Sequence, residues 1–266
     1  MGTAFLLLRL EAPLMAFGGP MVDFIGPTRR FPSQAQVTGL LGNALGYRHR
    51  DAEALETLQA RLRMAAAVLR PRHPSDPAGR PPPGEHGAGE RLRDYQTVFL
   101  GRPHLVDTGW TTRGTVEKRA GASSRETHIR HRWYVADSLV LVALTLEPAD
   151  QAPGLADLAE ALHHPARPLF IGRKPCLPTA PIGLGLVKAA SAADALRKGV
   201  ALLTSDKHRV PLDANLTAYA ELDERLQDEA GAHETERLID GRDWRNQLHT
   251  HTRGVRRRSL SLGRNP

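Results

Sequence analysis

The sequence predicts a globular α+β protein, and three observations lead to this class. Apolar runs of strand length occur at residues 4–10, 62–69 and 139–146. The stretches 34–45 and 155–162 instead repeat apolar residues at a spacing of three or four, as amphipathic helices do. The chain of 266 residues is 41% hydrophobic, which is enough to bury a substantial core.

The helix expected after residue 33 has the clearest boundaries. Ser33 lies at the N-cap, and Gln36 three residues later completes a capping box. Gly46 ends the helix, because glycine readily adopts the left-handed conformation of a C-terminal cap. One face is apolar and is expected to pack on a sheet; it consists of Val37, Leu40, Leu41, Ala44 and Leu45. The opposite face is small or polar, so that a partner's backbone can pass closely; it consists of Gln34, Thr38, Gly39, Gly42 and Asn43.

Further elements are expected on either side of this helix. Residues 4–10 form the first strand, and residues 11–30 form a loop rich in Gly and Pro that is long enough to have a functional role. Asp51 caps a second helix that runs to about residue 59. The apolar run 62–69 then returns as a strand.

The middle of the chain is expected to carry an insertion. Residues 71–90 contain six prolines and four glycines, which predicts a flexible loop. Residues 92–98 have the composition of a strand, whereas residues 111–130 are polar and basic. Such a ribbon gains little from burial and should project from the domain. Residues 139–144 should form a central strand that is covered on both faces.

A second helix–strand pair completes a recognisable order of elements. A helix over residues 155–162 is ended by Pro165, and a strand is expected over residues 168–171. Strand, helix, strand, strand, helix, strand is the order of the split βαβ, ferredoxin-like unit, and also of RNA-recognition domains. A further helix is capped by Ser191 and should end at Gly199.

The C-terminal part is short and basic. A charged helix is expected over residues 219–230 and a strand over residues 247–255. The chain has a net charge of +7 and a pI near 10.0. Much of this charge lies in residues 242–266, where one acidic residue, Asp243, accompanies seven arginines: Arg242, Arg245, Arg253, Arg256, Arg257, Arg258 and Arg264. This basic tail favours contact with nucleic acid or an acidic subunit, with a solvated, frayed chain end as the alternative.

Two observations concern the cellular compartment. The longest apolar run is far too short to span a membrane, and the N-terminal run lacks the basic start and cleavage site of a signal peptide. A single cysteine, Cys176, permits neither an internal disulfide nor a cysteine-based zinc site, and a buried structural thiol is the simplest interpretation. We therefore expect a cytoplasmic protein with no membrane association.

Two places in the sequence favour anion binding. Arg29 and Arg30 precede the first helix, whose N-terminal amides already attract negative charge. Gly172, Arg173 and Lys174 form a second candidate, in which a glycine backbone lies beside two cations. In both places the alternative is that the cations are simply solvated.

Several segments occur in order and at suitable spacing over roughly residues 4–190. They are the apolar first strand, the loop ending in Arg30-Phe31-Pro32-Ser33, the helix from Gly39 to Gly46, Leu92-Arg93-Asp94-Tyr95-Gln96-Thr97-Val98, and Gly172-Arg173-Lys174-Pro175-Cys176. Together they resemble the CasD family, the RAMP-superfamily subunit of type I-E CRISPR Cascade.

The resemblance implies a modified ferredoxin-like domain over residues 1–199, with an inserted thumb hairpin at about residues 92–132. A small β-rich region with the basic tail would follow over residues 200–266. The family's subunit holds the five-prime handle of the guide RNA (crRNA), joins the large and backbone subunits of Cascade, reaches target DNA only through the complex, and is not a catalyst.

This role assigns RNA contacts to particular residues and requires no cofactor or metal. Cations would hold phosphates, while Phe31 and Tyr95 would stack on bases, with core packing as the alternative for each aromatic ring. The predicted RNA-binding residues are Arg29, Arg30, Phe31, Ser33, Gln34, Arg93, Tyr95, Arg113, Gly172, Arg173 and Lys174. Two features depart from the family's pattern: Gln34 stands where a basic residue is frequent, and the loop 71–90 is longer than expected.

Two other classes of function remain open. A metal-independent endoribonuclease that cuts precursor crRNA needs a general base and a cation, which His128 or His131 and the neighbouring Arg130, Arg132 and Tyr134 can supply. A scaffold that binds only protein is the other class. Metal binding by the pairs His163-His164 and His249-x-His251 is disfavoured, because no third ligand lies at a suitable spacing.

Overall fold

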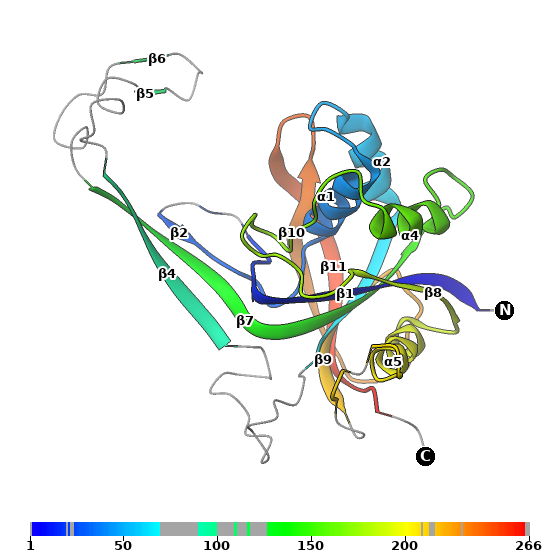
Figure 1. Ribbon diagram of the computed structural model, residues 1–266. Coiled ribbons are helices and arrows are strands. Elements are labelled where there is room, and N and C mark those ends of the chain that lie inside the picture. The colour runs from blue at the N-terminus through cyan, green and yellow to red at the C-terminus, as the bar shows by residue number, and fades with distance from the viewer. Residues whose placement is uncertain are drawn as a thin grey trace.

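The computed structural model describes most of the chain (Figure 1). The described residues are 2–19, 21, 24–69, 90–99, 109–110, 116–117, 127–208, 210–212, 216–229 and 231–263. The fold is mixed α/β, with a large sheet and few helices in this part of the chain. In the described residues, no helix is long and apolar enough to cross a membrane.

Nine strands form one sheet. Seven of them lie in the order β10-β11-β9-β3-β7-β1-β8, while β2 and β4 pair only with β7. All neighbours in the sheet are antiparallel except β2 and β7, which are parallel. The strands are β1 (Thr3–Met15), β2 (Ile25–Gly26), β3 (Leu62–Leu69), β4 (Glu90–Phe99), β7 (Thr127–Leu146), β8 (Gly183–Ala189), β9 (Thr217–Asp223), β10 (Glu234–Asp243) and β11 (Leu248–Ser261). A separate two-stranded sheet pairs β5 (Gly109–Trp110) with β6 (Val116–Glu117).

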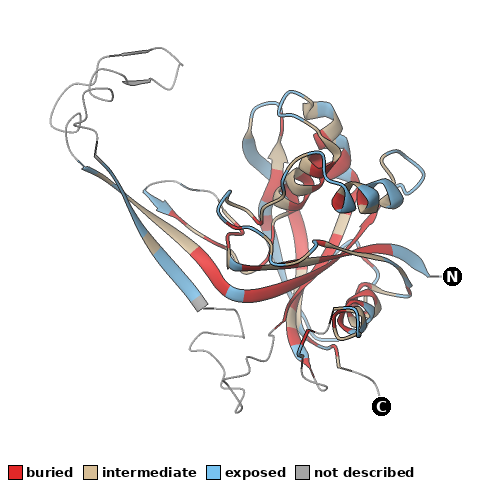
Figure 2. Cartoon of the chain, viewed as in Figure 1, coloured by how far each residue is buried: buried red, intermediate tan, exposed pale blue. Residues whose placement is uncertain are grey.

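Helices cover both faces of the sheet. The helices α1 (Gln34–Leu45), α2 (Ala52–Arg61) and α4 (Leu155–His163) lie on one face, and α5 (Ala192–Leu203) lies on the other (Figure 1). Because successive strand residues point to opposite faces, each central strand contributes side chains to two hydrophobic cores, one on each face of the sheet. In β1, Leu6 and Leu8 pack beneath α1 and α4, whereas Phe5 and Leu7 pack against α5. Figure 2 shows the resulting buried band through the sheet.

The predicted central strand is confirmed. Residues 139–144 lie within β7 and are almost fully buried, because β7 has β1 and β3 as neighbours and helices on both faces. The strand predicted over residues 62–69 has these same bounds in the structure.

The boundaries of α1 are also confirmed. The Ser33 hydroxyl accepts a hydrogen bond from the Gln36 amide at 3.1 Å, and Gly46 ends the helix with φ of 88°. The small face of α1 does admit a close approach, but the neighbour belongs to the same chain. A Cβ at Gly42 would lie 2.5 Å from Leu55 of α2, so glycine lets the two helices pack together.

Three predicted elements are wrong. The strand expected over residues 168–171 is absent, and β8 takes its place in the sheet at residues 183–189. The loop expected from residue 11 begins later, because β1 continues to Met15 in register with β7. The helix expected over residues 219–230 is replaced by β9, whose pairing with β3 and β11 determines its conformation.

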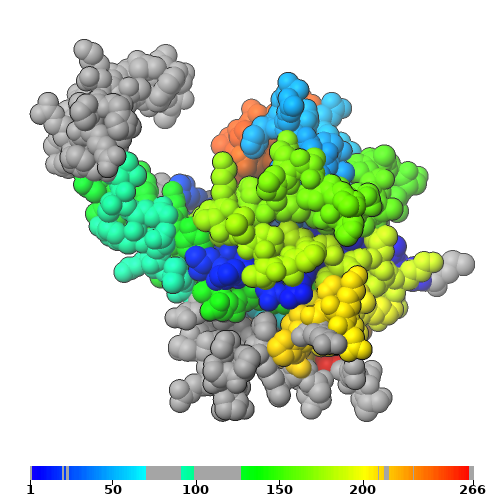
Figure 3. Space-filling model, in the orientation of Figure 1, coloured from blue at the N-terminus to red at the C-terminus, as the bar shows by residue number. Residues whose placement is uncertain are grey.

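The pair β4–β7 extends from the body as an arm (Figures 1 and 3). Along the arm, β4 pairs only with β7, and residues 91–98 are mostly exposed. Most of the predicted insertion, residues 100–126, lies outside the described residues apart from β5 and β6, and so does nearly all of the predicted loop 71–90. The domain boundary at residue 199 stays a prediction, although α5 runs through it and β9–β11 extend the same sheet.

Candidate nucleic-acid interface

Two adjoining cavities form a groove along α1. The larger has a volume of about 620 Å³ and the smaller about 240 Å³. Ala35, Gln36, Gly172 and Arg242 line both of them, which makes the groove continuous. Its walls come from α1, from the loop between α4 and β8, and from the end of the β10–β11 hairpin.

The groove is strongly cationic. No Asp or Glu occurs among the described residues that line either cavity. The basic lining residues are Arg48, His49, Arg167, Arg173, Arg242 and His249. Tyr47 and Phe170 add aromatic surface. Uncompensated arginines in a concave surface attract anions, and phosphate groups in particular.

Arg242 occupies the junction of the two cavities. Its backbone amide donates to Gln59 Oε1 at 2.9 Å, which fastens the end of β10 to α2. Its guanidinium donates to Gln247 Oε1 at 2.6 Å and lies 5.3 Å from the Trp244 ring centroid. Trp244 is itself buried and donates to Gln59 Oε1. The cation is therefore held at the groove by packed neighbours.

Arg173 lines the smaller cavity, as expected, but its guanidinium is already engaged. It donates to the carbonyls of Trp133 at 3.0 Å and Gly26 at 3.3 Å, and it lies 4.6 Å from the ring centroid of Tyr134. Arg173 thus connects the groove to the base of the arm. The neighbouring Lys174 is exposed and does not line the cavities described here.

Gly172 is required by backbone geometry. Its φ is 96°, and a Cβ at this position would lie 1.8 Å from the carbonyl oxygen of Ala16. The glycine lets the loop pass directly over the end of β1, where the Ala16 amide donates to the Ile171 carbonyl at 3.2 Å. The close approach to Ala16 therefore explains why glycine is needed at this position.

Arg29 and Arg30, the first predicted anion site, line neither cavity of the groove. They line a third cavity of about 390 Å³, which shares Ser33 with the smaller groove cavity. Arg29 donates to the Ile239 carbonyl at 3.2 Å, and Arg30 lies 5.1 Å from the Tyr219 ring centroid. Three carboxylates share this third cavity, those of Glu221, Glu236 and Asp240, so its charge is largely balanced.

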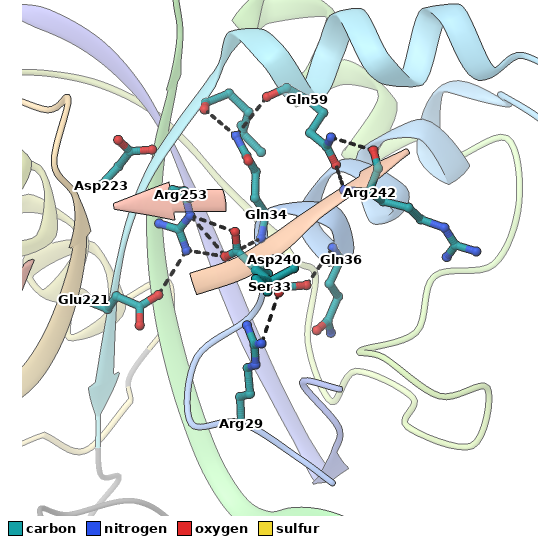
Figure 4. Close-up of polar contacts among 12 residues, drawn as sticks. Arg29, Ser33, Gln34, Gln36, Gln59, Glu221, Asp223, Asp240, Arg242 and Arg253 are labelled. Carbon is teal, nitrogen blue, oxygen red and sulfur yellow. Dashed lines mark hydrogen bonds and ion pairs between the residues drawn. The ribbon is translucent and has the colours of Figure 1, made fainter. Parts of the chain in front are cut away.

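The N-terminus of α1, expected to attract a phosphate, holds a carboxylate of the same chain (Figure 4). Asp240 Oδ2 accepts a hydrogen bond from the Gln34 amide at 3.2 Å. Asp240 also pairs with Arg253 at 2.7 Å, and Arg253 pairs with Glu221 at 3.1 Å. Burial alone would lower the pKa of Arg253, but these two carboxylates outweigh it and raise the pKa above its ordinary value.

Two predicted RNA contacts are replaced by packing inside the protein. Phe31 is 4% exposed and lies in the core, with its ring centroid 6.0 Å from that of Tyr219. Gln34 is 6% exposed, and its side-chain amide donates to the carbonyls of Gln59 and Leu62. Both side chains are thus almost fully buried, and Phe31 contributes only to the wall of the third cavity. Ser33 lines two cavities, and its hydroxyl caps α1.

Arg93 and Tyr95 lie on the arm, away from the cavities described here. They belong to β4 opposite Trp133 and His131, and Tyr95 is 56% exposed. Its ring packs edge-on against His131 at 5.2 Å. Arg113 lies outside the described residues.

In residues 242–263, the described part of the basic tail, β11 is paired with β9 and β10, and several arginines have partners within the protein. Arg253 is buried with Asp240 and Glu221, Arg257 pairs with Glu221 and Glu236, and Arg258 pairs with Asp228. Arg256 donates to the Leu226 carbonyl at 2.6 Å. Among the tail arginines that the structure describes, Arg242 is the one that lines the groove.

The histidines of the nuclease hypothesis lie on β7. His128 and His131 point to opposite faces, as an odd spacing on a strand requires, and Tyr134 is buried under Arg173. His131 packs between the rings of Phe24 and Tyr95. Within the described residues, no group of three His, Cys, Asp or Glu side chains is arranged to hold a metal ion.

His249 lines the smaller cavity, and the Cys176 amide donates to the carbonyl of Arg173, which also lines it. Partial desolvation, followed by the charges of Arg242 and Arg29, lowers the pKa of His249. Burial raises the pKa of Cys176, with an opposing effect from the hydrogen bond and charge of Arg173. The Cys176 side chain is fully buried, as expected for a structural thiol.

Sequence reasoning missed the cations that line the larger cavity, Arg48 and Arg167, and missed Arg242 as a groove residue. Arg167 is fixed by Asn43 Oδ1 at 2.7 Å and by the Tyr47 carbonyl. No local motif marks these positions, because three separate segments bring them together.

An α/β fold with a carboxylate-free cationic groove defines a candidate anion-binding protein, and comparisons with known proteins identify its family. Residues 5–256 match the family described as CRISPR-associated protein (Cas_Cas5), so the chain belongs to this family. It is 30% identical over 197 residues to the CRISPR system Cascade subunit CasD of Escherichia coli (strain K12), covering 73% of this chain and 75% of that relative.

Two solved structures share the fold. A chain of a CRISPR RNA-guided surveillance complex has a TM-score of 0.61 at 23% identity, covering 98% of this chain and 94% of its own length. A crystal structure of a Cas protein has a TM-score of 0.57 at 22% identity, covering 97% and 95%.

Proposed function

We propose that this chain is a non-catalytic, RNA-binding subunit of a CRISPR surveillance complex of the Cascade type, and that it caps the five-prime handle of the crRNA. Family membership and the relation to CasD support the assignment to Cascade. The observation that carries RNA binding is the groove along α1, which four arginines line without a carboxylate.

The groove suits a single strand of RNA. Such strands are held by cations on their phosphates, by aromatic surfaces beneath their bases and by hydrogen bonds to the 2′-hydroxyls. Arg48 and Arg242 supply cations, while Tyr47 and Phe170 supply aromatic surface. Base pairing reads the target in such complexes, so the protein needs to hold only backbone and shape.

Finer features of the assignment belong to the same proposal. The strand order β8-β1-β7-β3 with α1 and α4 supports a ferredoxin-like domain, and the exposed pair β4–β7 supports a thumb. The large subunit and the backbone subunits of the complex are the proposed protein partners. Target DNA is then reached through the complex, in the cytoplasm.

The nuclease alternative has less support from the site. Cleavage requires a general base beside a bound 2′-hydroxyl. His128 and His131 face opposite sides of β7 and line none of the three cavities described above. We therefore assign binding without cleavage.

Binding of repeat-derived handle RNA to the full-length chain tests the proposal. The double variant Arg48→Gln/Arg242→Gln should weaken binding at least about tenfold, because it removes two phosphate contacts. The control Arg237→Gln removes an exposed arginine of β10 that lines none of these cavities, and should change affinity less than about twofold.

Three outcomes would overturn the proposal. If the double variant and the control lose the same RNA affinity, the groove is not the RNA-binding site. Metal-free production of a discrete shorter RNA, abolished by His131→Ala, would establish the nuclease. Stable association with a large-subunit partner in the absence of any RNA binding would establish a scaffold.

A further inference from the structure

The four arginines of the groove offer a bound strand many hydrogen-bond donors and no acceptor. The amide oxygen of Asn43, which lines the larger cavity, already accepts from Arg167 Nε at 2.7 Å. Phosphates need donors, but ribose hydroxyls and base amino groups need acceptors.

Gln36 supplies such an acceptor at the junction of the two cavities, both of which it lines. Its Nε2 donates to the Ala16 carbonyl at 3.2 Å, which fixes which end of the amide is the oxygen. No described residue donates to Gln36 Oε1, and this atom is not among the buried atoms without a partner. Figure 4 shows the side chain running from α1 away from the Asp240–Arg253 pair.

The position of this acceptor is well determined. The backbone amide of Gln36 donates to Oγ of Ser33, the N-cap residue of α1, so the backbone is held at the start of the helix. The Ala16 carbonyl that holds the side chain lies beneath Gly172, where the loop crosses the end of β1. Arg173 and Arg242 line the smaller cavity with Gln36, so a phosphate can bind beside it.

We propose that Gln36 is a specificity-determining residue of the groove, whose side-chain carbonyl accepts a hydrogen bond from a donor group of the bound nucleic acid. This inference rests on the proposed function. A ribose 2′-hydroxyl and an exocyclic base amino group share the required chemistry. The first would select RNA over DNA, and the second would select a base at one position of the handle.

A cycle of protein and RNA changes tests this inference. The protein change is Gln36→Met, which keeps the length of the side chain and removes its carbonyl. The RNA changes are single 2′-deoxy substitutions along the handle and, in a second set, single bases that lack the exocyclic amino group. Affinity is measured for the full-length chain, with thermal unfolding as the check on folding.

Gln36→Met should weaken binding of the unmodified handle about 3- to 10-fold, as expected for one hydrogen bond. At one handle position, the modified RNA should bind the wild type about 3- to 10-fold more weakly than the unmodified RNA does. Gln36→Met should bind this modified RNA and the unmodified RNA equally well. The set in which this position occurs identifies the donor as a hydroxyl or an amino group.

Other outcomes separate the two proposals. If Gln36→Met weakens every RNA by the same factor, modified or not, the residue acts only on the structure and the inference fails. Unchanged affinity in Gln36→Met also contradicts it while leaving RNA binding intact. If the wild type shows no salt-sensitive binding of the handle, the proposed function itself fails.

Discussion

At the scale of single residues, Arg253 and Asp240 form a buried pair on which the start of α1 depends. Asp240 is 1% exposed and Arg253 is 4% exposed, and the same carboxylate accepts from the Gln34 amide. Removing one member of a buried pair leaves the other charge without compensation in a medium that solvates it poorly. The pair therefore links β10 and β11 to the helix that forms the groove.

Asp240→Ala should lower the free energy of unfolding by about 3–5 kcal/mol, because Arg253 loses its nearest carboxylate inside the protein. Glu236→Ala is the matched control on the same strand: its carboxylate is 49% exposed and pairs with Arg257, so its loss should amount to less than about 1 kcal/mol. Denaturant unfolding of both variants measures the difference. Equal losses would contradict the role given to the buried pair.

The position of His249 in the groove predicts that handle affinity depends on pH. Its pKa is lowered in the free protein, so the ring is neutral near pH 7. A phosphate bound nearby would favour the charged ring and raise this pKa, so binding takes up a proton and handle affinity should rise as pH falls from about 7.5 to 6. Because one group titrates, the gain should stay below about tenfold per pH unit.

His249→Gln should remove this dependence, since glutamine does not titrate. Affinity measured across the pH range at constant ionic strength is the check. A wild-type affinity that is flat with pH, or a variant that retains the dependence, would place the bound phosphates away from His249.

The sequence could not reveal some partners within the site, because the interacting residues lie far apart along the chain. Arg29 and Arg30 before a capped helix predicted a phosphate site at the start of α1, but a carboxylate of the same chain binds there. The carboxylate that binds there, Asp240, is 206 residues away from Gln34, and no local pattern connects them. The carboxylate partners of Arg253 and Arg257 are also non-local, at 13 to 36 residues away, so the tail looked uncompensated.

At the scale of elements, the turn at Gly172 sets the wall of the groove. It has φ of 96°, and a Cβ would meet the Ala16 carbonyl oxygen at 1.8 Å. Gly185 in β8 also has a positive φ, 130°, but a Cβ there would meet nothing within 4 Å. The two glycines therefore differ in the space around them, while both conformations strain an L-residue.

Gly172→Ala should reduce stability clearly more than Gly185→Ala, by about 2 kcal/mol or more against about 1 kcal/mol, because only the first adds a collision with backbone to the dihedral strain. Thermal unfolding compares them directly. Similar melting temperatures for the two variants would show that the loop can move off β1 without loss.

Elements with local signals were predicted well, and elements fixed by distant neighbours were not. Ser33 and Gly46 contain the information for both ends of α1. By contrast, residues 219–230 carry enough charge to suggest a helix. Their first part belongs to β9, which lies between β3 and β11 in the sheet, where pairing determines the conformation.

At the scale of the whole molecule, the groove and the arm are both built on elements of one sheet, which positions them relative to each other. The groove forms where α1, the α4–β8 loop and the β10–β11 hairpin meet, and Arg173 connects it to β2 and β7 at the base of the arm. The α+β class and the central strand were predictable from hydrophobic pattern alone. The groove required the assembly of segments from both ends of the chain.

The dependence of handle binding on salt tests the central claim most directly, because each phosphate contact on a single strand contributes about 0.7 to the slope of log affinity against log salt concentration. Arg48→Gln/Arg242→Gln should reduce the magnitude of this slope by about 1.4, while Arg237→Gln should leave it unchanged. A slope that is the same in the wild type and in the double variant would contradict the claim that this groove holds the RNA.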